Sequence, residues 1–208
     1  MSEVLKKVVV LVSGGGTNLQ SLIDKVHGVS CEIIAVISDN KDAYGLERAK
    51  NAGIEAFALP YKGYEDKSDF FKDLYDRLDG LDPDLVVLAG FLKILTPEFY
   101  DRFHNKIMNI HPSLIPSFCG KGFYGIRVHE AVINYGAKVS GVTVHFADDG
   151  ADTGPIILQQ TVTVEDDDTP ESLQAKILVH EHVILPKAVE LFCKDKLYFE
   201  GRRVKIKK

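Results

Sequence analysis

The sequence predicts an α/β fold: a Rossmann-like, mostly parallel twisted sheet flanked by helices, with an antiparallel extension in the C-terminal half. Short apolar, β-branched runs alternate with amphipathic segments through the first half of the chain. The first of these runs, KVVVLVS at 7–13, lacks polar alternation and is typical of a strand covered on both faces. Strands that alternate with helices imply parallel pairing through right-handed crossovers.

The first half of the chain reads as repeated strand–helix units. Expected strands occupy residues 7–13, 31–39, 54–60, 83–90 and 106–111. Expected helices occupy residues 17–28, 44–53, 65–81 and 96–104. Gly28 and Gly53 are placed to end helices, and Pro97 lies in a first helical turn, where its missing N–H costs nothing.

The second half of the chain changes character. Longer apolar runs at 137–147 and 154–164 predict the antiparallel extension of the sheet. A long closing helix is expected over 169–195, with Thr169 as its cap, and 197–206 is expected to form a terminal hairpin.

The overall numbers fit one globular domain. The chain has 208 residues, so we expect a single domain over 1–208, with a Rossmann-like half at 1–105 and a more irregular half at 106–208. A net charge of −5 argues against a nucleic-acid binder. No apolar run approaches a membrane span, and the first run enters a glycine turn as a strand does, so we expect a cytoplasmic protein. Three unpatterned cysteines argue against disulfides or a thiolate zinc site.

A glycine turn, SGGGTNLQ at 13–20, joins the first expected strand to the first expected helix. The amides of Gly16, Thr17 and Asn18 would open that helix and point at an anion, which is usually a phosphate. The turn lacks the Lys-Ser/Thr of a P-loop and the third glycine of a dinucleotide fingerprint. The alternative is a plain strand-to-helix turn with Thr17 as a cap.

Apolar residues follow the fourth expected strand in LAGFLKIL at 88–95. Phe91, Leu92, Ile94 and Leu95 could form the wall of a pocket for a flat heterocycle, whose edge backbone groups would recognise. Simple core packing under the next helix explains the same pattern.

A polar pair ends the fifth expected strand. Asn109 and His111 lie two residues apart and would face the same side of an extended chain, and Pro112 restricts His111 to that geometry. A histidine can exchange protons near neutrality, and an asparagine amide can donate to a developing oxyanion. Together they suit acyl-type transfer with direct attack by a substrate amine. An Asx-type turn with a satisfied histidine is the alternative.

A carboxylate partner for His111 is expected in the loop HFADDGADTGPII at 145–157. Asp152 precedes a rigid Thr-Gly-Pro turn and is the best candidate to hold the histidine and raise its pKa. A solvated acidic turn is the alternative. A metal site made of His145 with Asp148, Asp149 or Asp152 is a third reading, although no His-x-x-x-His or cysteine spacing supports it.

Several stretches together resemble the glycinamide ribonucleotide transformylases, a family of folate-dependent formyltransferases. The resemblance covers nearly the whole chain. It rests on these segments: VLVSGGGTNLQSLI, AYGLERAKNAGI, PDLVVLAGFLKIL, MNIHPSLIPSF, VHEAVINYGAKVSGVTVHFADDGADTGPIILQ and HEHVILP. The pattern Asn-x-His-Pro-Ser-Leu-x-Pro is strongly specific for the superfamily.

The resemblance implies a catalytic role for Asn109, His111 and Asp152, with 10-formyltetrahydrofolate as co-substrate and no metal. It implies that the first half binds the phosphate of glycinamide ribonucleotide and that the second half holds the catalytic residues and the folate loop. The implied contacts to glycinamide ribonucleotide are Gly16, Thr17, Asn18 and Glu181. The implied folate contacts are Lys67, Leu92, Lys93, Ile94, Leu95, Asn109 and Asp149. The partners are small molecules, with no nucleic acid and no membrane, and the protein is expected to be a monomer or homodimer.

Two positions depart from the family pattern. Lys93 stands where an arginine is frequent, and Lys67 matches an arginine that commonly meets the folate tail. Lysine keeps the charge but loses the planar fork, so the tail contacts are the weakest part of the resemblance. The main competing function is formyltetrahydrofolate deformylase or another folate-dependent formyltransferase. A nicotinamide-dependent oxidoreductase or a non-catalytic nucleotide-binding module would leave Asn109, His111 and Asp152 unexplained.

Overall fold

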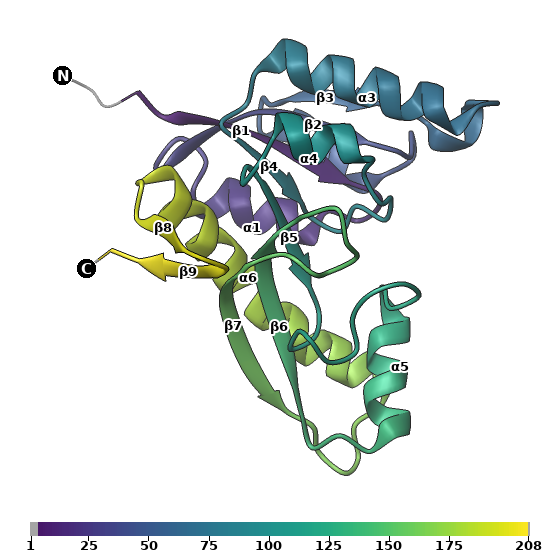
Figure 1. Cartoon of the computed structure of the whole chain (residues 1–208). Coiled ribbons are helices and arrows are strands. Elements are labelled where there is room, and N and C mark those ends of the chain that lie inside the picture. Colours follow the sequence, from purple (N-terminus) through teal and green to yellow (C-terminus); the bar gives the residue numbers. More distant parts are fainter. Residues whose placement is uncertain (1–3, 208) are drawn as a thin grey trace. The chain divides into compact units, whose positions relative to one another are not determined.

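The computed structural model describes residues 4–207 (Figure 1). The described chain forms two compact units, one ending at Met108 and the other beginning at Asn109. In hydrogen-bonded order the main sheet runs β3-β2-β1-β4-β5-β6-β7, and β5 (Ile107–His111) carries the chain from the first unit into the second. None of the helices within 4–207 is long and apolar enough to cross a membrane.

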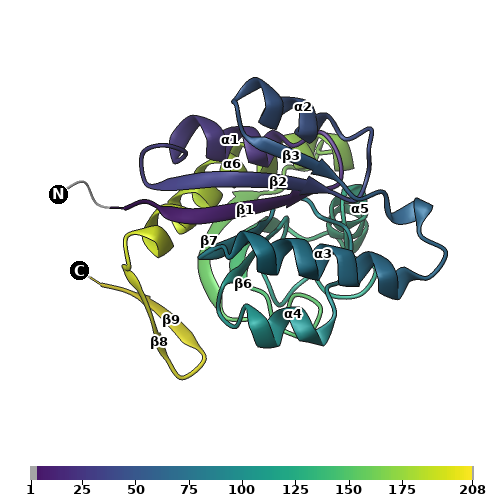
Figure 2. The same ribbon diagram turned by 90° about the horizontal axis from the view of Figure 1, so that it is seen from above.

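The first unit has the predicted parallel architecture. Strand β1 pairs in parallel with β2 and β4, and β2 pairs in parallel with β3. Helices α1 and α3 cover opposite faces of these strands (Figure 2). The strands are β1 (Lys6–Val12), β2 (Cys31–Ser38), β3 (Glu55–Ala58) and β4 (Leu85–Leu88). The helices are α1 (Thr17–Lys25), α2 (Tyr44–Asn51), the 3-10 turn η1 (Tyr61–Gly63), α3 (Lys67–Leu81) and α4 (Pro97–Arg102).

Burial follows the sequence pattern in this unit. The run Val8–Val12 of β1 is fully buried, as expected for a strand covered on both faces. Helix α3 begins after Asp66, whose side chain accepts a hydrogen bond from the Ser68 N–H at 2.8 Å. It then buries Phe70, Leu74 and Leu78, which lie on one stripe at helical spacing.

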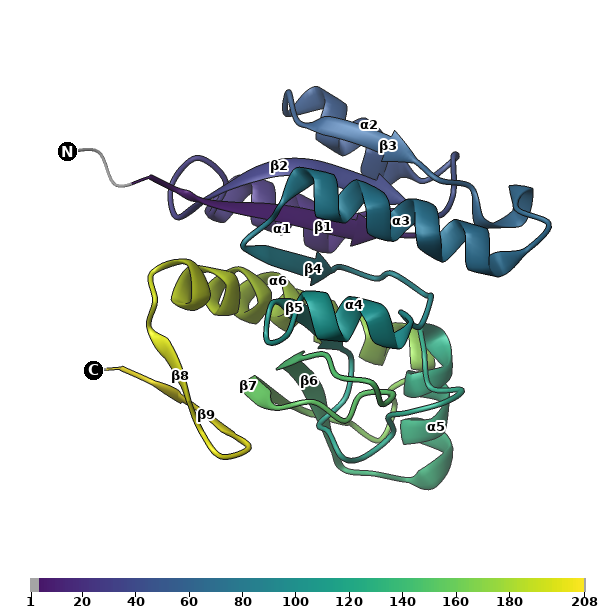
Figure 3. The ribbon, with the colours of Figure 1, turned by 45° about the horizontal axis from the view of Figure 1, so that its top comes forward.

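The second unit contains the predicted antiparallel extension. Strands β6 (Val139–Phe146) and β7 (Ile156–Thr163) pair in antiparallel fashion, and helix α6 (Pro170–Cys193) packs against both (Figure 3). Thr169 caps α6 through a reciprocal pair of hydrogen bonds with Ser172. The predicted terminal hairpin is present as β8 (Leu197–Glu200) and β9 (Arg203–Ile206).

One helix in this unit was not anticipated. Helix α5 (Ile126–Tyr135) follows a segment that contains Gly120, Gly122 and Gly125, and we expected no helix there from the sequence. Its apolar stripe is short, because only Val128, His129 and Val132 are buried, and its N-cap Gly125 gives no capping signal in the sequence. The α/β fold class with an antiparallel C-terminal extension is nevertheless confirmed.

The glycine turn after β1 depends on a close backbone approach to α2. A Cβ atom at Gly16 would lie 2.7 Å from the Cα of Gly45, and the φ of Gly16 is +68°. The Gly45 N–H donates to the Gly14 carbonyl at 3.0 Å, and the Arg48 Nε donates to the Gly15 carbonyl at 2.8 Å. These contacts fix the turn that leads into α1.

We therefore expect Gly16→Ala to destabilise the protein by about 3 kcal/mol, because it combines a left-handed backbone with a steric clash. Urea denaturation monitored by circular dichroism measures the change. Gly14→Ala is the matched control, since a Cβ there meets no atom within 4 Å. Equal stability of the two variants would contradict the described contact between the turn and α2.

Candidate functional site

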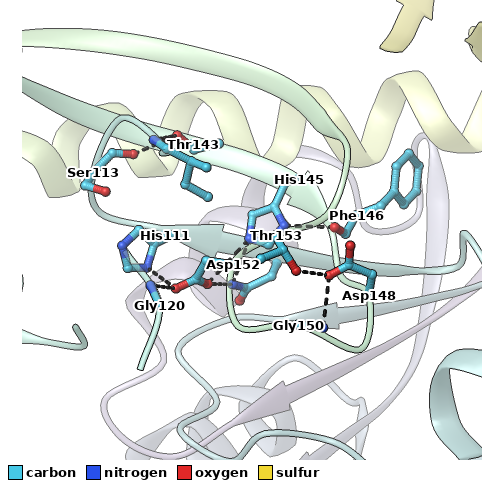
Figure 4. Close-up of polar contacts among 12 residues, drawn as sticks. His111, Ser113, Gly120, Thr143, His145, Phe146, Asp148, Gly150, Asp152 and Thr153 are labelled. Carbon is cyan, nitrogen blue, oxygen red and sulfur yellow. Dashed lines mark hydrogen bonds and ion pairs between the residues drawn. The ribbon is translucent and has the colours of Figure 1, made fainter. Parts of the chain in front are cut away.

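The predicted polar residues of the second unit meet at the end of β5. Asn109 and His111 belong to this strand, and Asp152 lies in the turn 147–155 between β6 and β7. Figure 4 shows His111 and Asp152 facing each other. His111 is only 4% exposed. The Asn109 Nδ2 lies 3.4 Å from one Asp152 oxygen, and the His111 Nδ1 lies 3.5 Å from the other. The structure thus brings the three residues of the predicted catalytic group into contact.

Both ring nitrogens of His111 face oxygen acceptors. The Nε2 atom lies 2.9 Å from the Phe118 carbonyl oxygen, and because a carbonyl only accepts, Nε2 carries a hydrogen there. The Nδ1 atom faces the Asp152 carboxylate. A ring placed between two acceptors can hold a proton on either nitrogen, which is the property that an acid–base catalyst needs.

Burial and charge act in opposite directions on the pKa of His111. Removal of the ring from water lowers the pKa, whereas the Asp152 carboxylate and the Phe118 carbonyl raise it. The desolvation effect is the larger, so the pKa of His111 lies below its ordinary value. We had expected Asp152 to raise this pKa; its contribution has that sign, but burial outweighs it.

Asp152 is held by several donors. It adopts a left-handed φ of 59°, and one carboxylate oxygen accepts the Gly120 N–H at 2.9 Å. Burial alone would raise the pKa of Asp152, but His145, His111 and the Gly120 N–H lower it below the ordinary value. Asp152 is therefore an ionised, anchored carboxylate rather than a residue of a freely solvated acidic turn.

His145 is the residue whose role the sequence analysis missed. We considered it only as a possible metal ligand, but its Nδ1 lies 2.8 Å from the Phe146 carbonyl and must donate to it. In the neutral ring, Nε2 is then an acceptor, and it receives the Asn109 Nδ2 hydrogen at 3.2 Å. His145 therefore orients the Asn109 amide. Its position at the end of β6, next to the Asp152 turn, is the signal that could have identified it.

No metal site replaces this arrangement in the described chain. Within residues 4–207, no group of three or more His, Cys, Asp or Glu side chains is arranged to hold a metal ion. Asp148 accepts hydrogen bonds from Thr153 and Gly150 within its own turn, and Asp149 is exposed.

The loop after His111 is fixed to β6 and β7 by buried hydrogen bonds. The Thr143 hydroxyl donates to the Ser113 carbonyl at 2.7 Å and accepts the Ile115 N–H at 3.1 Å (Figure 4). The Gln159 amide donates to the same hydroxyl and to the Ile115 carbonyl, each at 3.0 Å. This network stabilises the backbone that leads from His111 toward Phe118.

A second buried histidine lies near His111. His129 of α5 is 2% exposed, and its Nδ1 has no hydrogen-bond partner among the described residues. Burial, together with the charge of His111, lowers the pKa of His129 to about 4. His129 is therefore neutral in the folded protein at physiological pH.

In the first unit, Gly16, Thr17 and Asn18 lie at the start of helix α1. Gly16 is the N-cap residue and no side chain caps the helix, so Thr17 is not the cap that the alternative reading required. A helix N-terminus whose N–H groups lack an earlier turn favours an anion. Thr17 is exposed and Asn18 is 8% exposed.

The segment after β4 is divided between core and surface. Phe91 and Leu95 are buried, whereas Leu92 and Ile94 are 56% and 62% exposed. The Leu92 N–H donates to the Ser13 hydroxyl at 3.0 Å, which ties this segment to the glycine turn. Core packing therefore explains half of the apolar pattern, and the exposed pair remains available for a ligand.

Two lysines with predicted folate contacts meet at one tyrosine. The Nζ atoms of Lys67 and Lys93 lie 4.9 and 4.8 Å from the ring centroid of Tyr61. Lys93 also pairs with Asp39 at 2.8 Å, and Lys67 donates to the Tyr61 and Tyr64 carbonyls. Both ammonium groups thus have protein partners in this structure. In the second unit, Glu181 of α6 is 9% exposed.

Comparison with known proteins identifies the family. The family model described as Formyl transferase matches residues 6–189. The chain belongs to the formyl transferase family. It is 40% identical to the phosphoribosylglycinamide formyltransferase of Haemophilus influenzae, over 93% of this chain and 90% of that protein. It is also 40% identical to the chloroplastic phosphoribosylglycinamide formyltransferase of Vigna unguiculata, but spans only 62% of that protein's length.

Solved structures agree with this assignment. Glycinamide ribonucleotide transformylase 1 from Symbiobacterium toebii has a TM-score of 0.91 and 42% identity, over 98% of this chain and 95% of that one. A formyltetrahydrofolate deformylase from Pseudomonas syringae has a TM-score of 0.88 at 25% identity, with 67% of that chain covered. The fold is therefore shared by both enzymes, while the sequence is more similar to the transformylases.

The contribution of the Asp152 charge to the pKa of His111 can be measured. Asp152→Asn removes the charge that raises the pKa of His111, so we expect that pKa to fall further, by about 1 unit. The pH dependence of the His111 Cε1–H chemical shift reports it. Asp149→Asn removes an exposed charge from the same turn and should leave the titration unchanged. A His111 pKa that is unaffected by Asp152→Asn would contradict the described pair.

The lowered pKa of His129 predicts that the stability of the protein depends on pH. Because its pKa is about 4 in the folded protein and near 6.5 in the unfolded chain, the unfolded state binds the proton first as the pH falls. The stabilising effect of the neutral ring is complete above pH 6.5 and is lost as the pH falls toward 4. We expect His129→Gln to reduce the loss of unfolding free energy between pH 7 and pH 5, measured by urea denaturation. An identical loss in both proteins would show that His129 titrates normally in the folded state.

Proposed function

We propose that this protein is a phosphoribosylglycinamide formyltransferase. It transfers the formyl group of 10-formyltetrahydrofolate to the amine of glycinamide ribonucleotide, a step of de novo purine biosynthesis. The observation that carries the proposal is the convergence of Asn109, the buried His111 and Asp152 in one group of polar contacts. Two relatives that this chain covers over most of their length, from Haemophilus influenzae and Escherichia coli, are named phosphoribosylglycinamide formyltransferase.

The proposed chemistry is direct attack by the substrate amine on the formyl carbon. The Asn109 amide and the His111 Nε2–H donate to the formyl oxygen as negative charge develops on it. In this scheme the formyl oxygen replaces the Phe118 carbonyl as the acceptor at Nε2. The tetrahedral intermediate then collapses with loss of the folate nitrogen, which takes a proton from the protonated His111. Asp152 stabilises the protonated His111 and receives the proton that leaves the attacking amine.

We assign the substrate contacts on the same basis. The phosphate of glycinamide ribonucleotide would bind the amides of Gly16, Thr17 and Asn18 at the start of α1. Glu181 would contact the ribose or the glycinamide end. The folate would use the following residues: Lys67, Leu92, Lys93, Ile94, Leu95, Asn109 and Asp149. Lys67 and Lys93 would exchange their present partners for the carboxylates of the folate tail. A cytoplasmic location and a monomeric or homodimeric state are part of this proposal.

A deformylase is the second candidate, because the structural similarity to the Pseudomonas syringae enzyme is high. The two activities differ in the acceptor of the formyl group, which is the amine in one and water in the other. Release of tetrahydrofolate by the purified protein, followed with and without glycinamide ribonucleotide, separates them. We expect release only with the amine acceptor. Release without it supports hydrolysis, and no release with it would refute the proposed function.

The contribution of Asn109 can be measured in the same assay. We expect Asn109→Ala to lower kcat by roughly 10²–10³-fold, which is the typical effect of removing one oxyanion donor. Asn105→Ala, at the end of the preceding loop, is a control on the same segment. A kcat for Asn109→Ala within a few-fold of that of the control would remove Asn109 from the oxyanion site.

A further inference from the structure

The C-terminal hairpin is anchored beside the turn that carries Asp152. Strand β9 contacts β7 (Figure 1). The ring of Phe199 in β8 packs on Phe146, with centroids 5.2 Å apart. Phe146 is the last residue of β6, is 1% exposed, and also contacts Phe192 of α6 at 6.2 Å. The hairpin is therefore fixed at the point where the 147–155 turn begins.

The turn itself is tightly folded. The Asp148 carboxylate accepts the Thr153 hydroxyl at 2.5 Å and the Gly150 N–H at 3.3 Å (Figure 4). A Cβ atom at Gly150 would lie 1.9 Å from the Thr153 Oγ1, so Gly150 and Thr153 are in direct contact within the turn. Since Asp152 lies within this turn in a left-handed conformation, its position depends on how its neighbours are held.

One side chain of the hairpin reaches this turn. Arg202, in the two-residue link between β8 and β9, donates from Nη2 to the carbonyl oxygen of Thr153. Arg202 forms no ion pair with the residues described, so its contact with the turn is not a by-product of a surface salt bridge. A hydrogen bond from a guanidinium is charge-assisted and is stronger than one from a neutral donor.

We propose that Arg202 is a positioning residue, which holds Thr153 and through it keeps the Asp152 carboxylate directed at His111. The proposal rests on the proposed function, in which Asp152 acts on His111. The carboxylate and the Nδ1 atom are 3.5 Å apart, so a small displacement of the turn changes their interaction. The C-terminal hairpin is then part of the catalytic support and not merely a solvated end.

The test compares three variants of the full-length protein. Arg202→Ala removes the donor, and Arg202→Lys keeps a cationic donor. Arg203→Ala removes the adjacent exposed arginine, whose side chain makes no hydrogen bond or ion pair within residues 4–207. We expect Arg202→Ala to lower kcat about tenfold while the KM for glycinamide ribonucleotide stays within twofold. In Arg202→Ala, the limb of the kcat–pH profile that reports the titration of His111 should move to lower pH, because the displaced Asp152 raises the pKa of His111 less. Arg202→Lys restores part of kcat, and Arg203→Ala resembles the wild type.

A second measurement does not depend on activity. Hydrogen exchange of the amides in residues 147–154 is compared in the wild type and the variants, at a temperature where thermal unfolding shows all of them to be folded. Faster exchange in Arg202→Ala alone supports the proposal that Arg202 holds the turn. This result stands even if the wild-type protein transfers no formyl groups and the proposed function is refuted separately. If the amides of Arg202→Ala exchange at the same rate as those of Arg203→Ala, the proposal is overturned. Faster exchange with wild-type kcat and pH profile also overturns it, because the contact would then be structural only.

Discussion

The Asp152 carboxylate joins segments that are distant in the sequence. One oxygen accepts the Gly120 N–H from the loop after β5, and the other lies within reach of the Asn109 amide on β5 itself. His111 and His145 face the same group from two strands. A carboxylate that is removed from water needs such partners, because an unpaired charge in a low-dielectric site is costly. The partners that Asp152 needs come from β5, from β6 and from the loop after β5, so the arrangement of these segments depends on this carboxylate.

Three buried histidines of the second unit differ because their surroundings differ. His111 is buried between two oxygen acceptors, so desolvation and charge act against each other on its pKa. The Nδ1 of His129 has no hydrogen-bond partner within residues 4–207, and burial is the main cause of its lowered pKa. The Nδ1–H of His145 donates to the Phe146 carbonyl in its own strand, and its Nε2 accepts from the Asn109 amide and orients it. The same type of side chain thus appears as a ring between two oxygen acceptors, as a buried neutral ring and as an orienting acceptor, and only the neighbouring atoms decide which.

Much of the fold was accessible from the sequence because its signals are local. The buried run in β1, the stripe of Phe70, Leu74 and Leu78 in α3, and the cap at Thr169 are read from periodicity and capping chemistry. Helix α5 lacks such signals: a glycine precedes it and few of its residues are buried. The residues Asn109, His111 and Asp152 could be singled out by chemistry and spacing, and more firmly by the family pattern.

The sequence by itself determined the fold class, the family and the candidate acid–base residues, because these depend on residue type and short-range spacing. The tertiary structure alone decided which groups touch them. Some of these contacts join residues up to 49 positions apart, and some depend on backbone atoms that every residue has. They are the contacts of the Phe118 carbonyl with His111, of His145 with Asn109 and of Arg202 with Thr153. The balance that lowers the pKa of His111 is likewise a property of burial. Burial is set by the packed chain as a whole, and no local pattern encodes it.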